Sequence, residues 1–236
     1  MAVRESPVAP RQQLVCFPHV GGTPEMYLDW FAQAPQSVEL AAMCYPGRGT
    51  RAGEPPAEAI THLAHEAADA LTASDLDIPL TLFGHSLGAL VAYETARLLT
   101  RPLTLAVSSC GSAHLPRRSL SPDENDKVLW TQLVELGGIS ASMARNPLIR
   151  ALTLPAARAD LRINNAYRWA AGPPLEHPVL ALAGDTDSLV PVADVQAWQH
   201  LTHARLRLHL HPGGHFYLLA ALADVLATLT ASETGT

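Results

Sequence analysis

The stretch LTLFGHSLGALVAYETA, residues 80–96, decides the fold. It runs from a short apolar segment through G-x-S-x-G at residues 84–88 into a segment rich in alanine and leucine. This order predicts a strand, a tight turn and a helix, the nucleophile elbow that lifts a serine hydroxyl, here Ser86, above the end of a sheet. The two glycines fit this interpretation because any side chain in so tight a bend would crowd the neighbouring strand and helix.

A serine nucleophile needs a base that takes its proton and an acid that orients the base. In α/β-hydrolases these groups follow in the chain order Ser, Asp or Glu, His. Two later segments supply that order, since GDTD at residues 184–187 follows a strand-like run at 178–183 and PGGH at 212–215 follows another at 205–210. Loops at the carboxyl ends of strands are where open α/β sheets bind ligands. His215 is therefore the predicted base.

Two aspartates compete for the acid's position. Asp185 directly follows the glycine at the end of the strand, where aspartate often stabilises a turn. Asp187 lies further into the loop, nearer the space that an imidazole needs. The local pattern leaves both open.

Most of the other histidines have ordinary structural interpretations. His62 and His65 lie in a predicted helix, and His209 and His211 lie in or at the end of a predicted strand. Either pair could bind a metal, but no further Cys, His or Asp completes a ligand set. We expect no metal and no organic cofactor.

The segment FPHVGG, residues 17–22, ends an early predicted strand in a glycine-rich turn. Acyl transfer builds negative charge on a carbonyl oxygen, and two backbone N–H groups normally stabilise it. One donor is the residue after the nucleophile, Leu87, and the other comes from a loop after an early strand. Val20, just before the paired glycines, is the predicted second donor. A phosphate-binding loop is disfavoured because no Lys-Ser or Lys-Thr follows the glycines.

Length and composition set wider bounds. The 236 residues are 48% hydrophobic and 16% charged, with a formal net charge of −6. These values predict one domain, residues 1–236, with a large core. With so few charges and a net negative balance, we do not expect a general nucleic-acid-binding role, which needs a clustered basic surface. The first residues lack a signal-peptide core, and no apolar run is long enough to span a membrane. Three cysteines in strand-like apolar runs indicate buried free thiols and a cytoplasmic location.

Strand-like runs alternate with helical patterns along most of the chain, which predicts a mostly parallel sheet with helices on both faces. The expected strands cover 13–17, 38–45, 79–84, 103–109, 178–183 and 205–210, and the expected helices cover 57–73, 86–100, 191–202 and 216–230. Residues 115–172 break the alternation with further helical patterns near 122–136, 142–152 and 155–170. This insertion follows a central strand, so we expect a helical lid above the active-site edge. The first ten residues and the tail 232–236 are expected to fray.

Five segments together resemble the stand-alone type II thioesterases of polyketide and non-ribosomal peptide biosynthesis, within the α/β-hydrolase superfamily. They are FPHVGG (17–22), YPGRG (45–49), GHSLG (84–88), GDTDSLV (184–190) and GGHF (213–216), in the family's order. The resemblance implies that Ser86 is the nucleophile, that Asp187 orients His215, and that Val20 gives an oxyanion N–H. The family usually has alanine at the position of Val20, but only the N–H is needed.

The same resemblance implies a substrate and a partner. The substrate would be an acyl thioester on the phosphopantetheine arm of an acyl or peptidyl carrier protein, and hydrolysis would clear stalled synthases. Thioesterase domains fused to synthases usually carry their acid after the strand that follows the nucleophile helix, whereas here that strand ends in SSCGS (108–112). The chain also begins and ends as expected of a free protein. Two alternatives remain, an esterase acting on a free small-molecule ester and a non-catalytic binding module with the same fold.

Residues 145–168 carry a concentration of positive charge in a chain that is acidic as a whole. Their only acid is Asp160, and the cations are Arg145, Arg150, Arg158, Arg162 and Arg168. Arg158 and Arg162, four positions apart, would share one face of a helix. This face is the predicted docking site for an acidic carrier protein, with an ordinary solvated helix surface as the alternative.

Overall fold

The computed structural model describes residues 2–4, 8–74 and 77–231, and its centre is a seven-stranded sheet in the order β1-β3-β2-β4-β5-β6-β7. All neighbouring strands are parallel except β1 and β3. The strands are β1 (Ala2–Arg4), β2 (Gln12–Phe17), β3 (Val38–Ala42), β4 (Leu80–His85), β5 (Leu103–Ser108), β6 (Val179–Gly184) and β7 (Leu206–His211). The central strands are largely apolar because both of their faces are covered.

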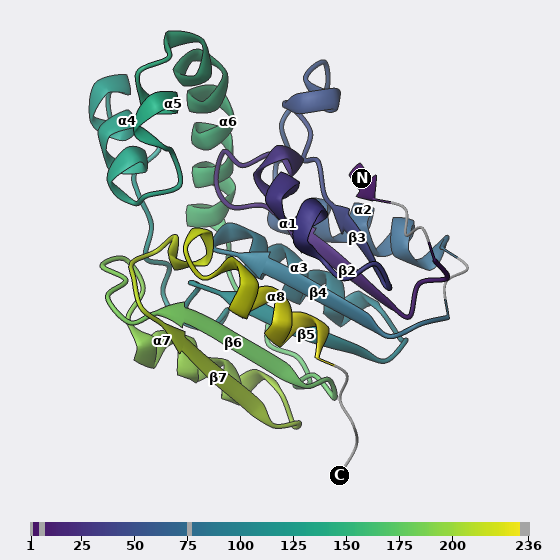
Figure 1. Ribbon diagram of the computed structural model, residues 1–236. Coiled ribbons are helices and arrows are strands. Elements are labelled where there is room, and N and C mark those ends of the chain that lie inside the picture. Colours follow the sequence, from purple (N-terminus) through teal and green to yellow (C-terminus); the bar gives the residue numbers. More distant parts are fainter. Residues whose placement is uncertain (1, 5–7, 75–76, 232–236) are drawn as a thin grey trace.

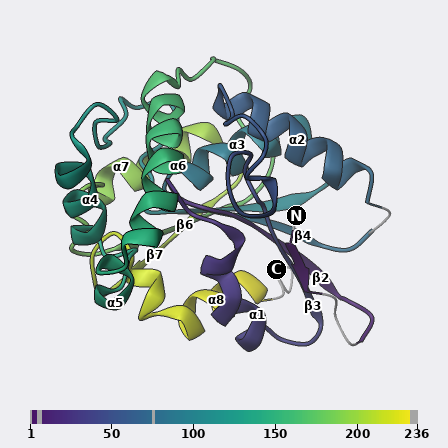
Figure 2. The same ribbon diagram turned by 90° about the horizontal axis from the view of Figure 1, so that it is seen from above.

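Helices pack on both faces of the sheet (Figure 2). One face is covered by α2 (Ile60–Thr72), α3 (Leu87–Leu98) and α7 (Val192–Gln196), whose apolar residues form one core cluster with the sheet. The other face is covered by α1 (Leu28–Gln33) and α8 (Leu222–Thr230), with Trp30 and Val225 among the buried residues of a second cluster. The chain continues through short 3-10 turns, η1 (Pro24–Tyr27), η2 (Gly49–Arg51), η3 (Ala197–Leu201) and η4 (Tyr217–Leu219).

Three helices between β5 and β6 stand together beyond one end of the sheet (Figure 1). They are α4 (Asp126–Glu135), α5 (Ala141–Ala144) and α6 (Pro147–Ala166), and we refer to residues 126–166 as the α4–α6 segment. The segment has a small core of its own, formed by Leu129, Trp130, Leu133, Leu154, Ala157 and Leu161. No helix within the described ranges is long and apolar enough to cross a membrane.

The structure corrects several expectations from the sequence. The two predicted helices at 142–152 and 155–170 are wrong, because α6 runs unbroken through Pro155. Pro155 lies on the exposed side of α6, and its neighbours Leu154 and Ala157 pack into the segment's core, so tertiary packing outweighs the local cost of proline. The predicted helix 216–230 is divided into η4 and α8.

The N-terminus also differs from expectation. Fraying of the first ten residues is wrong for Ala2–Arg4, which pair with Leu40, Ala41 and Ala42 of β3. Sequence reasoning missed this strand and also α1. The predicted fraying of the tail 232–236 lies outside the described residues.

Candidate active site

Ser86 occupies a strained turn between β4 and α3. Its φ of 55° and ψ of −121° lie in a region that residues other than glycine rarely adopt, at a cost of about 1–3 kcal/mol. Its N–H donates to the carbonyl of Ser108 on β5 at 2.8 Å, which ties the turn to the neighbouring strand. The rigid sheet thus holds Ser86 in place.

Backbone atoms crowd both glycines of the elbow. A Cβ on Gly84 would lie 2.1 Å from the carbonyl oxygen of Gly88, and a Cβ on Gly88 would lie 2.0 Å from that of Phe17. No side-chain movement can relieve contacts with the main chain. Only glycine therefore fits at either position.

His215 and Asp187 form a buried hydrogen-bonded pair. His215 Nδ1 lies 2.8 Å from Asp187 Oδ2, and the two side chains are only 3% and 1% exposed. With the proton of Nδ1 directed at the carboxylate, the other ring nitrogen, Nε2, carries the free lone pair of a base. The arrangement fits a general base with a fixed orientation.

The second carboxylate oxygen of Asp187 accepts the N–H groups of Leu189 at 2.9 Å and Val190 at 3.1 Å. Burial alone would raise the pKa of Asp187, but these N–H groups and His215 outweigh burial and lower it. Asp187 is therefore ionised and cannot rotate away from the imidazole.

Asp185 has a different role in the same loop. Its Oδ1 accepts the N–H of Gly213 at 3.0 Å, which holds the loop before His215 against the end of β6. Of the two aspartates left open by the local sequence, the structure brings Asp187 to the histidine.

The glycine-rich segment after β2 forms a tight turn over residues 19–22. The N–H of Gly22 donates to the carbonyl of His19 at 2.9 Å, and Gly21 has a φ of +71°. This is the geometry of a type II turn, which requires glycine at its third position. No acceptor within the described part of the chain takes the N–H of Val20. The Val20 N–H is thus available to a ligand, and its role as an oxyanion donor stays a prediction.

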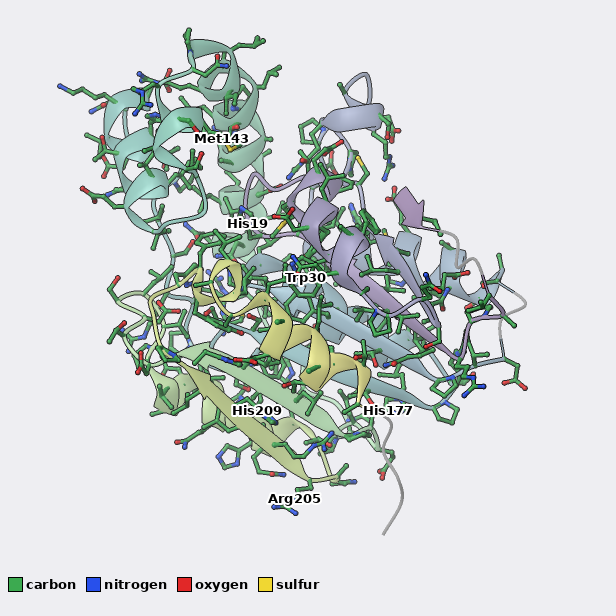
Figure 3. All side chains as sticks on the ribbon, in the orientation of Figure 1. His19, Trp30, Met143, His177, Arg205 and His209 are labelled. Atoms are coloured by element: carbon green, nitrogen blue, oxygen red, sulfur yellow. The ribbon has the colours of Figure 1, made fainter. Side chains whose placement is uncertain are left out.

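A cavity of about 500 Å³ joins these groups. Ser86, Leu87, His215 and Val20 line its floor, at the end of the sheet. Apolar side chains of the α4–α6 segment form the opposite wall, among them Leu133, Ile139, Met143, Ile149 and Leu161. Figure 3 shows His19 where the segment meets the sheet, with Met143 above it. The cavity is suited to an apolar substrate group held against Ser86.

Two further histidines, His85 and His19, lie close to His215, and the sequence pattern indicated no role in the site for either of them. The ring of His85 lies 5.2 Å from that of His215 between centroids, and the ring of His19 lies 6.0 Å from that of His85. Burial, followed by the charges of His215 and Arg48, lowers the pKa of His19 to about 3. Burial, again followed by the neighbouring histidines, lowers the pKa of His85 well below its ordinary value. Both rings are neutral.

His85 belongs to a hydrogen-bonded chain beneath the site. Its Nδ1 lies 3.0 Å from Ser108 Oγ, which lies 2.8 Å from the hydroxyl of Tyr217. His85 sits inside the G-x-S-x-G motif and Tyr217 is two residues after His215, so their proximity to the site was readable from the sequence. Their connection through β5 was not.

The remaining histidines lie elsewhere. His62 and His65 are on the exposed face of α2, and His211 stacks on Tyr217 at 5.0 Å between ring centroids. Across the described residues, no group of three or more His, Cys, Asp or Glu could hold a metal ion.

The two arginines of the predicted docking face differ in their surroundings. The guanidinium of Arg158 pairs with Asp126 at 2.6 Å and donates to the carbonyl of Pro122, whereas Arg162 is exposed. Both line a shallow hollow on the outside of α6. Arg162 is thus the more available of the two cations.

The sequence profile of the family described as "Thioesterase domain" matches residues 12–232. This chain belongs to the thioesterase family. Its match to that family and to solved relatives identifies it as a hydrolase that acts on thioesters, and confirms both the resemblance to type II thioesterases and the α/β-hydrolase fold.

Three relatives illustrate the similarity of this thioesterase to known proteins. Thioesterase PikA5 of Streptomyces venezuelae is 35% identical, over 87% of this chain and 75% of its own. RedJ, a thioesterase from the prodiginine pathway of Streptomyces coelicolor, is 34% identical, over 94% of this chain and 85% of its own, with a TM-score of 0.86. BorB, the type II thioesterase of the borrelidin biosynthetic cluster, is 33% identical, over 96% and 95%, with a TM-score of 0.87.

Proposed function

We propose that this thioesterase removes acyl groups from the phosphopantetheine arms of carrier proteins in polyketide or non-ribosomal peptide synthesis, as an editing enzyme. The observation that carries the proposal is the buried hydrogen bond between His215 and Asp187, beside a cavity that Ser86 also lines. The pathways named for RedJ and BorB support the substrate class.

In the proposed reaction the Ser86 hydroxyl attacks the thioester carbonyl while His215 Nε2 takes its proton. The N–H groups of Val20 and Leu87 stabilise the negative charge on the carbonyl oxygen. The C–S bond then breaks, and the proton on His215 passes to the departing thiol. Water, activated by the same imidazole, attacks the acyl-enzyme and releases the acid and free Ser86.

The α4–α6 segment has the proposed role of a lid, within an insertion spanning residues 115–172. Its apolar side chains face the floor of the cavity, where they would hold the acyl chain and exclude bulk water. The cavity's apolar walls favour an acyl group over a polar substrate.

The proposed partner is an acidic carrier protein that docks on the outer face of α6 through Arg158 and Arg162. The only acid between residues 145 and 168, Asp160, is buried against Arg48, so it does not offset the positive face. Charge complementarity would steer the carrier to the mouth of the cavity. Three buried free cysteines support a reducing, cytoplasmic location.

The test compares an acyl carrier thioester, the matching small thioester and an oxygen ester, with wild-type protein, Ser86→Ala, His215→Ala and the double variant. We expect the carrier thioester to be the best substrate. Each single substitution should remove activity by several orders of magnitude, with the double little worse, because the groups act as a unit. Preference for the oxygen ester would favour an esterase. Residual Ser86→Ala activity within about tenfold of wild type would remove Ser86 as nucleophile.

A further inference from the structure

Arg48 and Asp160 form a buried ion pair between distant parts of the chain. Arg48 belongs to the YPGRG segment, and Asp160 lies on α6, 112 positions later. The pair is bidentate, with Nη1 to Oδ2 at 2.6 Å and Nη2 to Oδ1 at 2.5 Å, and the side chains are 5% and 3% exposed. Burial alone would lower the pKa of Arg48, but the hydrogen bonds and charge of Asp160 outweigh it and raise the pKa. Arg48 is therefore charged inside the protein.

Both members of the pair also hold the turn that carries Val20. Asp160 Oδ2 accepts the N–H of Gly21 at 2.8 Å, and Arg48 Nη1 donates to the carbonyl of Gly22 at 3.2 Å. A single ion pair thus fixes the first and the third peptide groups after Val20, through the Gly21 N–H and the Gly22 carbonyl. The pair has no comparable contact with the acyl cavity, whose lining contains neither residue.

The preceding residues of the same turn are held in a similar way. The hydroxyl of Tyr45 donates to the carbonyl of Pro18 at 3.1 Å, and the Arg48 guanidinium lies 5.3 Å from the centroid of the Tyr45 ring. The YPGRG segment therefore forms hydrogen bonds on both sides of His19 and Val20, to Pro18 through Tyr45 and to Gly22 through Arg48.

Stability alone is a weak explanation for this pair. Transferring two charges from water into the interior is costly, and well-packed apolar residues often replace a buried ion pair without loss of stability. Apolar residues cannot, however, bind a backbone N–H and a backbone carbonyl. The contacts to Gly21 and Gly22 are the feature that an apolar replacement of the pair would not supply.

We propose that Arg48 and Asp160 are positioning residues, which hold the turn at residues 19–22 so that the Val20 N–H meets the developing oxyanion. Because Asp160 lies on α6, the same pair also fixes the position of the wall of the acyl cavity relative to the oxyanion donor. The inference rests on the proposed function, since it requires Val20 to act in the chemistry of Ser86.

The test uses Asp160→Asn and the double variant Arg48→Met/Asp160→Leu, which replaces both charges by apolar side chains of similar size. Glu66→Gln is the matched control, because it disturbs a nearby exposed arginine–carboxylate pair, Arg51–Glu66. Each protein is assayed for kcat, KM, thermal unfolding midpoint and inhibition by a trifluoromethyl ketone analogue of the acyl thioester. That ketone forms a tetrahedral adduct with a serine and places an oxyanion in the site.

We expect Asp160→Asn to lower both kcat and the unfolding midpoint. The double variant should regain the midpoint while its kcat stays about 10- to 100-fold low, the cost of a misplaced oxyanion donor. KM should change little, and affinity for the ketone should fall in parallel with kcat. Glu66→Gln should match wild type throughout. If Asp160→Asn cannot be purified, the double variant carries the same comparison.

Recovery of kcat together with the midpoint in the double variant would overturn the positioning role, as would an unchanged affinity for the ketone. Failure of the proposed function looks different. In that case Ser86→Ala would bind the ketone as tightly as wild type, whatever the Asp160 variants do.

Discussion

At the carboxyl edge of the sheet, backbone packs on backbone, whereas in the α4–α6 segment side chains pack on side chains. Gly88 lies so close to the carbonyl of Phe17 that no Cβ fits between them. In the segment, a small leucine-rich core holds three helices together, and large apolar side chains such as Leu148 and Leu152 remain 63% and 68% exposed. Few residue types therefore fit at the edge, while many fit in the segment, so the segment tolerates changes in sequence that the edge does not.

Few polar contacts join the two regions. They include the Arg48–Asp160 pair and the Gly21 N–H, which donates to Asp160. Just beyond the end of α6, the hydroxyl of Tyr167 donates to Glu94 at 2.5 Å and Trp169 Nε1 donates to the hydroxyl of Tyr93 at 3.1 Å. The α4–α6 segment and the residues just after it are thus attached to α3 and to the turn at residues 19–22, which carry the proposed nucleophile and the proposed oxyanion donor.

The largest expected effect lies at the edge, where Asp187→Asn should reduce kcat by about 10⁴-fold. The amide would favour the wrong tautomer of His215 and leave Nε2 protonated. Asp185→Asn is the matched control, two residues away, since its amide oxygen can still accept the N–H of Gly213. Its kcat should fall less than tenfold. Steady-state kinetics that reverse this ranking would show that the edge is organised around Asp185 instead.

The same contrast explains what could be predicted from the sequence. The tight turn of the elbow requires glycine, serine and glycine within five residues, at Gly84, Ser86 and Gly88. The motif could therefore be identified from the sequence without a structure. The strands around it were predicted to within a few residues at each end because they are short, largely apolar or alternating runs. Asp187 needed the family resemblance, since local turn chemistry suits either aspartate.

Long-range pairings gave no such signal. No sequence feature near Arg48 indicates a partner 112 positions away. The sequence pattern placed Asp160 on a basic helix that could be an ordinary solvated surface. The gap expected between residues 152 and 155 is a different error, because α6 continues through Pro155 and packs Leu154 and Ala157 into the core of the segment. In the α4–α6 segment, helices were therefore predictable, but their bounds and their polar contacts with the rest of the fold were not.

An intermediate effect is expected on the outer face of the segment. Arg162→Glu should raise KM for an acyl carrier protein about tenfold and flatten its dependence on salt, because it reverses a charge that would attract the partner. Hydrolysis of the matching small thioester should not change. Arg158→Glu should act in the same direction, but it also breaks the contact with Asp126.

Arg205→Glu is the control for this docking surface, since Arg205 is exposed at the opposite end of the molecule from Met143 (Figure 3). It should leave both substrates unaffected. Equal losses on the carrier and on the small thioester in Arg162→Glu would indicate damage to the segment itself, and the docking role would be abandoned.

The smallest expected effect is on the pH dependence of stability, and it comes from a histidine beneath the carboxyl edge of the sheet. The α4–α6 segment, residues 126–166, includes no histidine. Because the pKa of His85 is lowered by burial, the unfolded chain takes up a proton that the folded chain does not as the pH falls below about 6.5. The stabilising contribution of the neutral ring is therefore complete above that pH and is lost progressively below it.

The test substitutes His85→Asn, whose amide can still reach Ser108. Between pH 6.5 and 5.5 the free energy of unfolding of this variant should fall less steeply than that of the wild type. The exposed His65→Asn on α2 should give the wild-type slope. Denaturant unfolding at the two pH values measures the difference, and parallel curves for His85→Asn and wild type would mean that the ring beneath Ser86 is not held neutral by the fold.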